Sequence, residues 1–291
     1  MSENNRNSSL ADGGTRIRAA FSNSPSGRAF IPFITCGDPD LETTEQLVYA
    51  MAEAGADIIE LGIPFSDPTA EGPTIQAANL RALSGGVKTE DVFRMVGRIR
   101  ERCDIPLAFM TYANVVFSYD GGVPAGPASA EHAGGQTLRF IRRMREAGVD
   151  GLILPDVPFE EKDEFAVPCR EEGIAFISLI APTSHERIRK AAADADGFLY
   201  CVSSLGVTGT RDAITTDIGG MVRLAKEAAP ELPCAVGFGI STSEQAAEMA
   251  ALSDGAIVGS AIVKLCAEHG RDCVKPVAEY VRAMAAAVHG V

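Results

Sequence analysis

Two carboxylates eleven residues apart are the first groups in this chain that could carry out acid–base chemistry. Glu60 ends an apolar run and opens the stretch ELGIPFSDPTAEGP (60–73), and Glu71 follows in a loop punctuated by Pro and Gly. An apolar environment raises the pKa of a carboxyl group, so Glu60 could act as a general acid or base. The alternative is a Glu satisfied by a structural hydrogen bond or a helix start. We favour catalysis, because perturbed carboxyl groups cluster at active sites.

Glycine-rich turns suggest where an anion could bind. The turns GFGIS (237–241) and VGSAIV (258–263) would let backbone N–H groups approach phosphate oxygens, and a Ser hydroxyl would add a donor. Such turns also follow strands without any ligand, but two of them in these places favour phosphate binding. A third segment, SSLGVTGTR (203–211), is either a closing lid or a solvated connection, and we favour the lid.

Other ligand classes are disfavoured by composition. The formal net charge of −13 argues against nucleic acid as a partner, since that binding needs a basic surface. No apolar run approaches the roughly 20 residues of a membrane-spanning helix. The four histidines have no metal-ligand spacing, and the seven cysteines include no C-x-x-C pair, so we expect no metal site and reduced, buried thiols.

The elements that must position the two carboxylates follow a regular plan. Short apolar stretches of strand length alternate with segments that carry helix start and stop signals. Eight such repeats in about 260 residues are typical of a (β/α)8 TIM barrel, an α/β fold that places its chemistry at the carboxyl ends of the strands. A doubly wound sheet is the competing fold, but its G-x-G-x-x-G motif is absent. The expected strands are 29–35, 57–63, 106–112, 151–157, 175–181, 198–203, 233–239 and 255–261.

Two segments fall outside this plan. The polar residues 1–15 are expected to form a disordered N-terminal tail of a cytoplasmic protein, and residues 16–291 a single barrel domain. The stretch 118–135, rich in Gly, Pro and Ala, reads as a long surface loop after the third strand. A functional lid and a solvated insertion are both possible for this loop, and we favour the insertion. We also expect extra short helices.

Seven stretches in order resemble one known family, that of the tryptophan synthase alpha chain. They are PFITCGDPD, ELGIPFSDPTAEGPTIQAAN, YANVVF, PDVPFEE, SSLGVTG, VGFGIS and VGSAIVK, and the resemblance runs from about residue 16 to 289. It implies a TIM barrel that cleaves indole-3-glycerol phosphate to indole and glyceraldehyde 3-phosphate, without a metal or cofactor of its own. It also implies a PLP-dependent β subunit as partner in an α2β2 complex, where indole passes through a tunnel and is joined to serine.

The resemblance also implies roles for individual residues. Glu60 matches the family's catalytic Glu, which protonates the indole ring carbon, and Glu71 matches its second catalytic acid, which stabilises charge at the indole nitrogen. Tyr200 matches a Tyr near the catalytic Glu. The family's phosphate site matches Gly209, Gly239, Gly259 and Ser260, and its indole pocket matches Phe33, Tyr112 and Ile153. Thr208 matches a lid residue, and Asp67 belongs to the segment 66–72, which matches the part of the family that contacts β.

The sequence departs from the family at the second acid. Position 71 is usually Asp, and Glu lengthens the side chain by one methylene. Moving a catalytic carboxylate by about 1 Å can cost on the order of 10²-fold in rate, unless the loop shifts to absorb the change. Ser204 also stands where some members have Arg, and 118–135 is longer than usual. A binding and regulatory subunit that only activates β is therefore an alternative, while another phosphate-handling barrel would leave ELGIPFSDP unexplained.

Overall fold

A single parallel sheet forms a barrel, and its fifth strand segment is divided into two short strands, β5 and β6, one at each end of the strand order. The computed structural model describes residues 12–121, 133–202, 217–237 and 239–291. Within them the strand order is β5-β4-β3-β2-β1-β9-β8-β7-β6. β5 pairs with β4 and β6 pairs with β7, and only Ile177 separates β5 from β6. The strands are β1 Ala29–Thr35, β2 Ile59–Gly62, β3 Leu107–Met110, β4 Gly151–Ile153, β5 Ala175–Phe176, β6 Ser178–Ile180, β7 Leu199–Val202, β8 Cys234–Gly237 and β9 Gly255–Val258.

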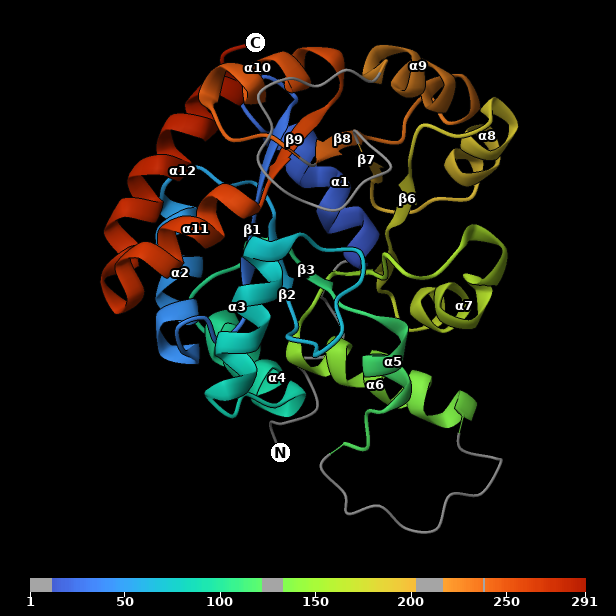
Figure 1. Ribbon diagram of the computed structural model, residues 1–291. Helices are drawn as coiled ribbons and strands as arrows, with labels where there is room; N and C mark the ends of the chain where they lie inside the picture. Colours follow the sequence, from blue (N-terminus) through green and yellow to red (C-terminus); the bar gives the residue numbers. More distant parts are fainter. Residues whose placement is uncertain (1–11, 122–132, 203–216, 238) are drawn as a thin grey trace, which may run out of the picture.

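The TIM barrel expected from the sequence is therefore confirmed, and the doubly wound sheet is excluded. All eight expected strands are present, with the fifth interrupted at Ile177. Helices surround the strands in Figure 1. They are α1 Gly13–Asn23, α2 Leu41–Glu53, α3 Pro73–Ser84, α4 Thr89–Arg100, α5 Ala113–Phe117, α6 Ala133–Ala147, α7 Asp163–Glu171, α8 His185–Ala193, α9 Ile218–Ala228, α10 Ser243–Leu252, α11 Ser260–His269 and α12 Val274–His289, with 3-10 turns η2 Phe159–Glu161 and η3 Gly270–Cys273.

The hydrophobic core has two layers because successive side chains of a strand point to opposite faces. In β1, Phe30 and Ile34 belong to the outer layer between strands and helices, whereas Ile31 and Phe33 belong to the cluster inside the barrel. Glu60 has the same parity as Ile58, which is also in the inner cluster. The alternation therefore places the Glu60 carboxyl group inside the barrel.

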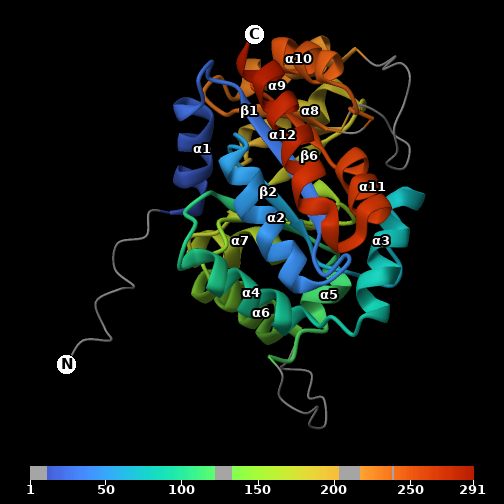
Figure 2. The same cartoon turned by 90° about the vertical axis from the view of Figure 1, so that its left-hand side faces the viewer.

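Helix α1 covers the end of the barrel where the strands begin. Its Ile17 and Phe21 are buried in the inner cluster, and the Phe21 ring lies 5.7 Å from that of Phe198. Figure 2 shows α1 at this end of the barrel and α3 and α11 at the other. Helix α1 begins at Gly13, inside the range 1–15 that the sequence analysis assigns to a disordered tail; residues 1–11 of that range lie outside the described residues.

Local sequence signals explain where several helices begin. Asp40 caps α2 by accepting a hydrogen bond from the Thr43 backbone N–H (2.8 Å), and Thr242 and Gln245 form a capping box at α10.

The expected loop at 118–135 contains residues 122–132, which lie outside the described part, and α6 starts at Ala133 within its range. In the described residues no helix has the length and apolar character to cross a membrane.

Candidate active site

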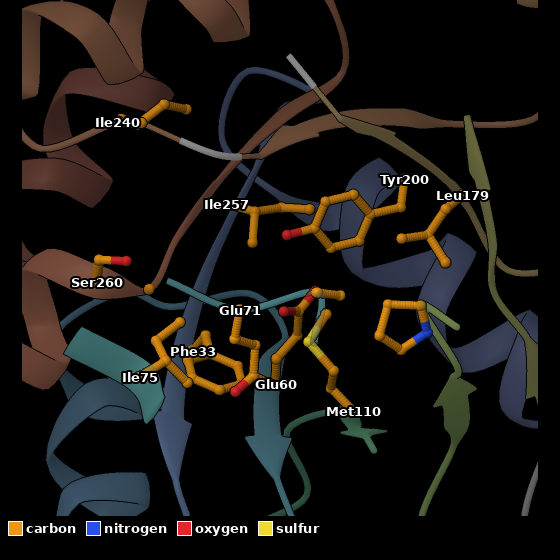
Figure 3. Close-up of a pocket in the computed structure, with 14 residues that line it drawn as sticks. Phe33, Glu60, Glu71, Ile75, Met110, Leu179, Tyr200, Ile240, Ile257 and Ser260 are labelled. Atoms are coloured by element: carbon orange, nitrogen blue, oxygen red, sulfur yellow. The ribbon is translucent and has the colours of Figure 1, made fainter. Parts of the chain in front are cut away.

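A pocket opens at the carboxyl ends of the strands, where barrels place their chemistry. It encloses about 610 Å³, including the space at its mouth. Figure 3 shows Glu60, Glu71, Met110 and Tyr200 around one space, with Ser260 to the side. The residues that line it come from the N-terminal and the C-terminal half of the chain: Phe33, Glu60, Ala70, Glu71, Ile75, Met110, Pro155, Leu179, Tyr200, Gly239, Ile240, Ile257, Gly259 and Ser260.

Glu60 is held by β2 between two neighbouring strands, in register with Phe33 on β1 and Ala108 on β3. Its residue surface is 1% exposed, and neither carboxyl oxygen has a hydrogen-bond partner among the described residues. Burial without a compensating cation raises the pKa of Glu60 to about 8. The group therefore carries a proton at neutral pH and can donate it into the pocket.

Tyr200 on β7 lies in the same pocket and is equally enclosed. Burial, and to a smaller extent the negative charge of Glu60, raises the pKa of the Tyr200 phenol well above its usual value. The ring lies against β8 at Gly237, where an added Cβ would come within 2.5 Å of the Tyr200 Oη. Gly237 is thus required by the close approach of this ring, and Tyr200 stays neutral beside the acid.

Glu71 enters the pocket from the loop between β2 and α3. Burial raises the pKa of its carboxyl group to about 7, and a hydrogen bond from Asn79 acts in the opposite direction. The Asn79 Nδ2 donates to the Glu71 Oε2 at 2.7 Å. The two carboxyl groups therefore differ in their hydrogen bonding: Glu60 has no hydrogen-bond partner among the described residues, and Glu71 has a neutral donor.

Two glycines make room for Phe33, which forms part of the apolar wall. A Cβ on Gly62 would lie 2.6 Å from the Phe33 Cζ, and one on Gly259 would lie 3.2 Å from its Cδ1. Gly259 also precedes α11, where its carbonyl accepts from the N–H groups of Ile262 and Val263 at 2.9 and 3.0 Å. The helix N-terminus, with Ser260 at its first position, therefore lies at the pocket.

Seven of the residues singled out from the sequence line this pocket, three lie elsewhere, and two fall outside the described residues. Tyr112 is buried beneath the β2–α3 loop, and its hydroxyl accepts a hydrogen bond from the Ala70 N–H at 3.1 Å. Ile153 is buried in the inner cluster, and Asp67 is exposed. Thr208 and Gly209 lie outside the described residues. The seven that line the pocket are Phe33, Glu60, Glu71, Tyr200, Gly239, Gly259 and Ser260.

Most of the apolar wall was missed by reasoning from the sequence, although a signal was present for part of it. Met110 and Leu179 have the interior parity of their strands, as shown by Ala108 and Ile177 in the inner cluster. Extending the alternation to the strand ends would have found both. Ile75 and Asn79 come from α3, where no local signal distinguishes them from other helix residues.

Two acidic residues at strand ends have structural partners. Asp38 accepts two hydrogen bonds from the Arg81 guanidinium, each at 2.8 Å, which joins the loop after β1 to α3. Asp156 accepts from the Ala113 N–H at the start of α5. Among the described residues no group of three or more His, Cys, Asp or Glu could hold a metal ion.

The fold and the pocket define the class of (β/α)8-barrel enzymes, with two acids at the carboxyl ends of the strands. Within that class, the family model described as "Tryptophan synthase alpha chain" matches residues 20–289. A tryptophan synthase alpha chain of Caldanaerobacter subterraneus subsp. tengcongensis is 47% identical over 256 residues, covering 87% of this chain and 91% of the relative. The chain therefore belongs to the tryptophan synthase alpha chain family.

Other relatives and solved structures agree. The alpha chain of Lacticaseibacillus casei is 44% identical, with 90% of this chain and 92% of the relative covered. Tryptophan synthase subunit alpha from Legionella pneumophila str. Paris superposes with a TM-score of 0.78 at 31% identity, covering 97% of this chain and 100% of that chain. A chain from a structural study of the tryptophan synthase a2b2 complex from Pyrococcus furiosus superposes with a TM-score of 0.76 at 34% identity, covering 88% of this chain and 97% of that chain.

Proposed function

We propose that this chain cleaves indole-3-glycerol phosphate to indole and glyceraldehyde 3-phosphate by a retro-aldol reaction. In this proposal protonated Glu60 donates its proton to the indole carbon that bears the side chain. The ring becomes an indolenine, and the adjacent side-chain hydroxyl gives its proton to the Glu60 carboxylate as the carbon–carbon bond breaks. The bonding electrons return to the ring, which leaves indole and an aldehyde.

The carboxyl group of Glu60 is the observation that carries this proposal. It is fixed on a strand, buried, and without a hydrogen-bond partner among the described residues. A buried polar group without such a partner costs stability, so its retention favours a functional role. With its pKa raised to about 8, Glu60 is an acid at neutral pH and is strong enough as a base to take up a proton again.

The role proposed for Glu71 is to face the indole nitrogen as a carboxylate. With a pKa of about 7 it is substantially ionised under the conditions in which Glu60 is still protonated. Positive charge that develops on the ring nitrogen would be stabilised by this carboxylate in a dry pocket. Phe33, Met110, Leu179 and the other apolar lining residues would hold the flat ring between the two acids.

The phosphate is proposed to bind at the opposite side of the pocket. Gly259 and Ser260 lie at the N-terminus of α11, where unsatisfied N–H groups and the helix dipole favour an anion. Gly239, with φ of 83°, contributes a turn that a residue with a Cβ would adopt only with strain. Gly209 and Thr208 are assigned to the phosphate and to a lid by resemblance alone.

A partner is proposed on the same grounds. The family's alpha chain works without its own cofactor, and PLP belongs to the β subunit. The a2b2 complex named for the Pyrococcus furiosus protein supports the same assembly for this chain, with Asp67 and the 66–72 loop at the contact. A cytoplasmic location is proposed as well, because all seven cysteines are free thiols, as expected in a reducing compartment.

The proposal is tested by incubating the purified chain with indole-3-glycerol phosphate, with and without an added β subunit, and measuring indole. Release of indole by the chain alone, increased by the β subunit, is the expected result. If neither sample forms product in a single-turnover experiment, the chain would instead be the binding and regulatory subunit considered in the sequence analysis.

A further inference from the structure

Asn79 joins three parts of the β2–α3 connection through one amide. Its Oδ1 accepts from the Phe65 backbone N–H at 3.1 Å, near the start of the loop. Its Nδ2 donates to the Glu71 Oε2 at 2.7 Å and to the Ile75 carbonyl at 3.0 Å, one turn earlier in α3. Asn79 is 4% exposed. Amide and carboxylate are therefore locked together away from solvent.

The remaining surroundings of Glu71 leave Asn79 in control of the carboxylate. Gln76 donates from Nε2 to the Glu71 backbone carbonyl at 2.7 Å, which fixes the backbone and not the carboxyl group. Among the described residues, the titratable groups that share its surroundings are Glu60 and Tyr200 in the pocket and Tyr112 below the loop, whose own pKa is raised by burial and, to a smaller extent, by Glu71. None of these three is a cation, so the neutral amide is the group that favours the ionised form.

We propose that Asn79 is a positioning residue for the reaction, which holds the longer side chain of Glu71 in its catalytic place and keeps it ionised; this inference rests on the proposed function. The helix makes this possible because Asn79 sits on rigid α3, whereas Glu71 sits on the loop. Glu71 thereby gains a fixed direction without a salt bridge, whose cation would offset the negative charge proposed to face the indole nitrogen.

The variants N79A and N79D test this role through the pH dependence of indole release. Removing the donor in N79A takes away the hydrogen bond that favours the Glu71 carboxylate, so the acidic limb of kcat/KM moves to higher pH by about one unit. N79D keeps an acceptor for the Phe65 N–H but places a second carboxyl group against Glu71, and moves the limb further. With a carboxylate displaced by about 1 Å, kcat at neutral pH falls on the order of 10- to 100-fold.

Q76A is the matched control, because it removes a hydrogen bond of similar length to the backbone of the same residue. Its acidic limb stays where it is in the unaltered chain. In an E71Q background, N79A produces little further loss of kcat, since Asn79 acts through the carboxylate. Independent effects in the double variant, or an unmoved limb in both N79A and N79D, would overturn the inference.

A second readout separates this inference from the proposed function. In protein labelled with ¹³C at Glu carboxyl carbons, the Glu71 signal is assigned by its loss in E71Q and then titrated. N79A and N79D raise the Glu71 pKa whether or not indole is released. If the unaltered chain releases no indole, the proposed function fails; if the Glu71 pKa is the same in all three proteins, the role of Asn79 fails.

Discussion

Glu60 and Glu71 are chemically identical side chains that the fold makes different. Glu60 is on a strand inside the barrel and has no hydrogen-bond partner among the described residues, whereas Glu71 accepts from an amide. Burial raises the pKa of both groups, to about 8 for Glu60 and about 7 for Glu71. A pair of carboxyl groups with separated pKa values is how one pocket can supply an acid and an anion at the same pH.

The pH profile of kcat/KM, which reports the groups of the free enzyme, should therefore be bell-shaped. Glu60 must be protonated to donate, so activity is present below its pKa and is lost as the pH rises through about 8. Glu71 must be ionised, so activity is lost as the pH falls through about 7. The measurement is steady-state indole release in buffers of constant ionic strength, from about pH 5 to about pH 10, so that both limbs of the profile are covered. A rate that keeps rising to the highest pH would contradict the role of Glu60 as an acid.

The sequence pointed to the two carboxyl groups of the pocket and gave no sign of Asn79, the residue proposed to position one of them. Glu60 could be predicted because a carboxylate in an apolar strand is chemically unusual. Asn79 could not, because an Asn in an amphipathic helix is ordinary until the helix is placed against the loop. Its contact with Phe65 spans fourteen positions and depends on the path of the whole connection.

At the scale of elements, strand parity and two glycines shape the pocket. Phe33 and Glu60 lie on the same side of the sheet, in register on β1 and β2. The sequence could not show this for Phe33, because the stretch 29–35 is apolar almost throughout and has no alternation. The interruption at Ile177 could not be predicted either, because the stretch 175–181 is uniformly suited to a strand. The interruption lies where the sheet must close, since β5 pairs with β4 and β6 pairs with β7.

The variant G62A tests the fit between β2 and Phe33. An added Cβ would lie 2.6 Å from the Phe33 Cζ, so the ring must move out of the apolar wall. We expect a loss of about 1–3 kcal/mol in the free energy of unfolding and a higher KM. Urea unfolding and steady-state kinetics provide the two measurements.

G97A on α4 is the control for this substitution, because nothing lies within 4 Å of a Cβ added there. It should raise the free energy of unfolding by about 0.5–1 kcal/mol, as an Ala does in a helix interior, and leave KM unchanged. Equal stabilities and equal KM values for G62A and the unaltered chain would show that Phe33 is not held by this contact.

At the scale of the whole molecule, the barrel separates stability from function along its axis. Helix α1 covers the end where the strands begin, and α3 lies at the end where they finish (Figure 2). The pocket, which Ala70 and Glu71 of the 66–72 loop help to line, is at that second end. The alternating pattern of the sequence predicted this division, because a parallel barrel brings all strand ends together. Helix α1 was not predicted, because residues 13–23 precede the first strand and so lie outside the strand–helix repeat from which the other helices were predicted.

The variant D67A tests where the β subunit binds. Asp67 is exposed on the loop at the mouth of the pocket, and we expect its loss to weaken the affinity for β by about 10-fold. D104A is the matched control, since Asp104 is also an exposed Asp but precedes β3 at the other end of the barrel. Isothermal titration with the β subunit gives both dissociation constants, and equal values would place the interface elsewhere.

Indole release by the variant E60Q measures the central claim most directly. Gln has nearly the shape of the protonated Glu but cannot give up a proton to carbon, so kcat should fall by at least about 10²-fold. Because Glu60 is already uncharged at neutral pH, the variant should keep its fold, which circular dichroism and thermal unfolding would verify. An E60Q protein that is folded and releases indole at the rate of the unaltered chain would contradict the assignment of Glu60 as the acid.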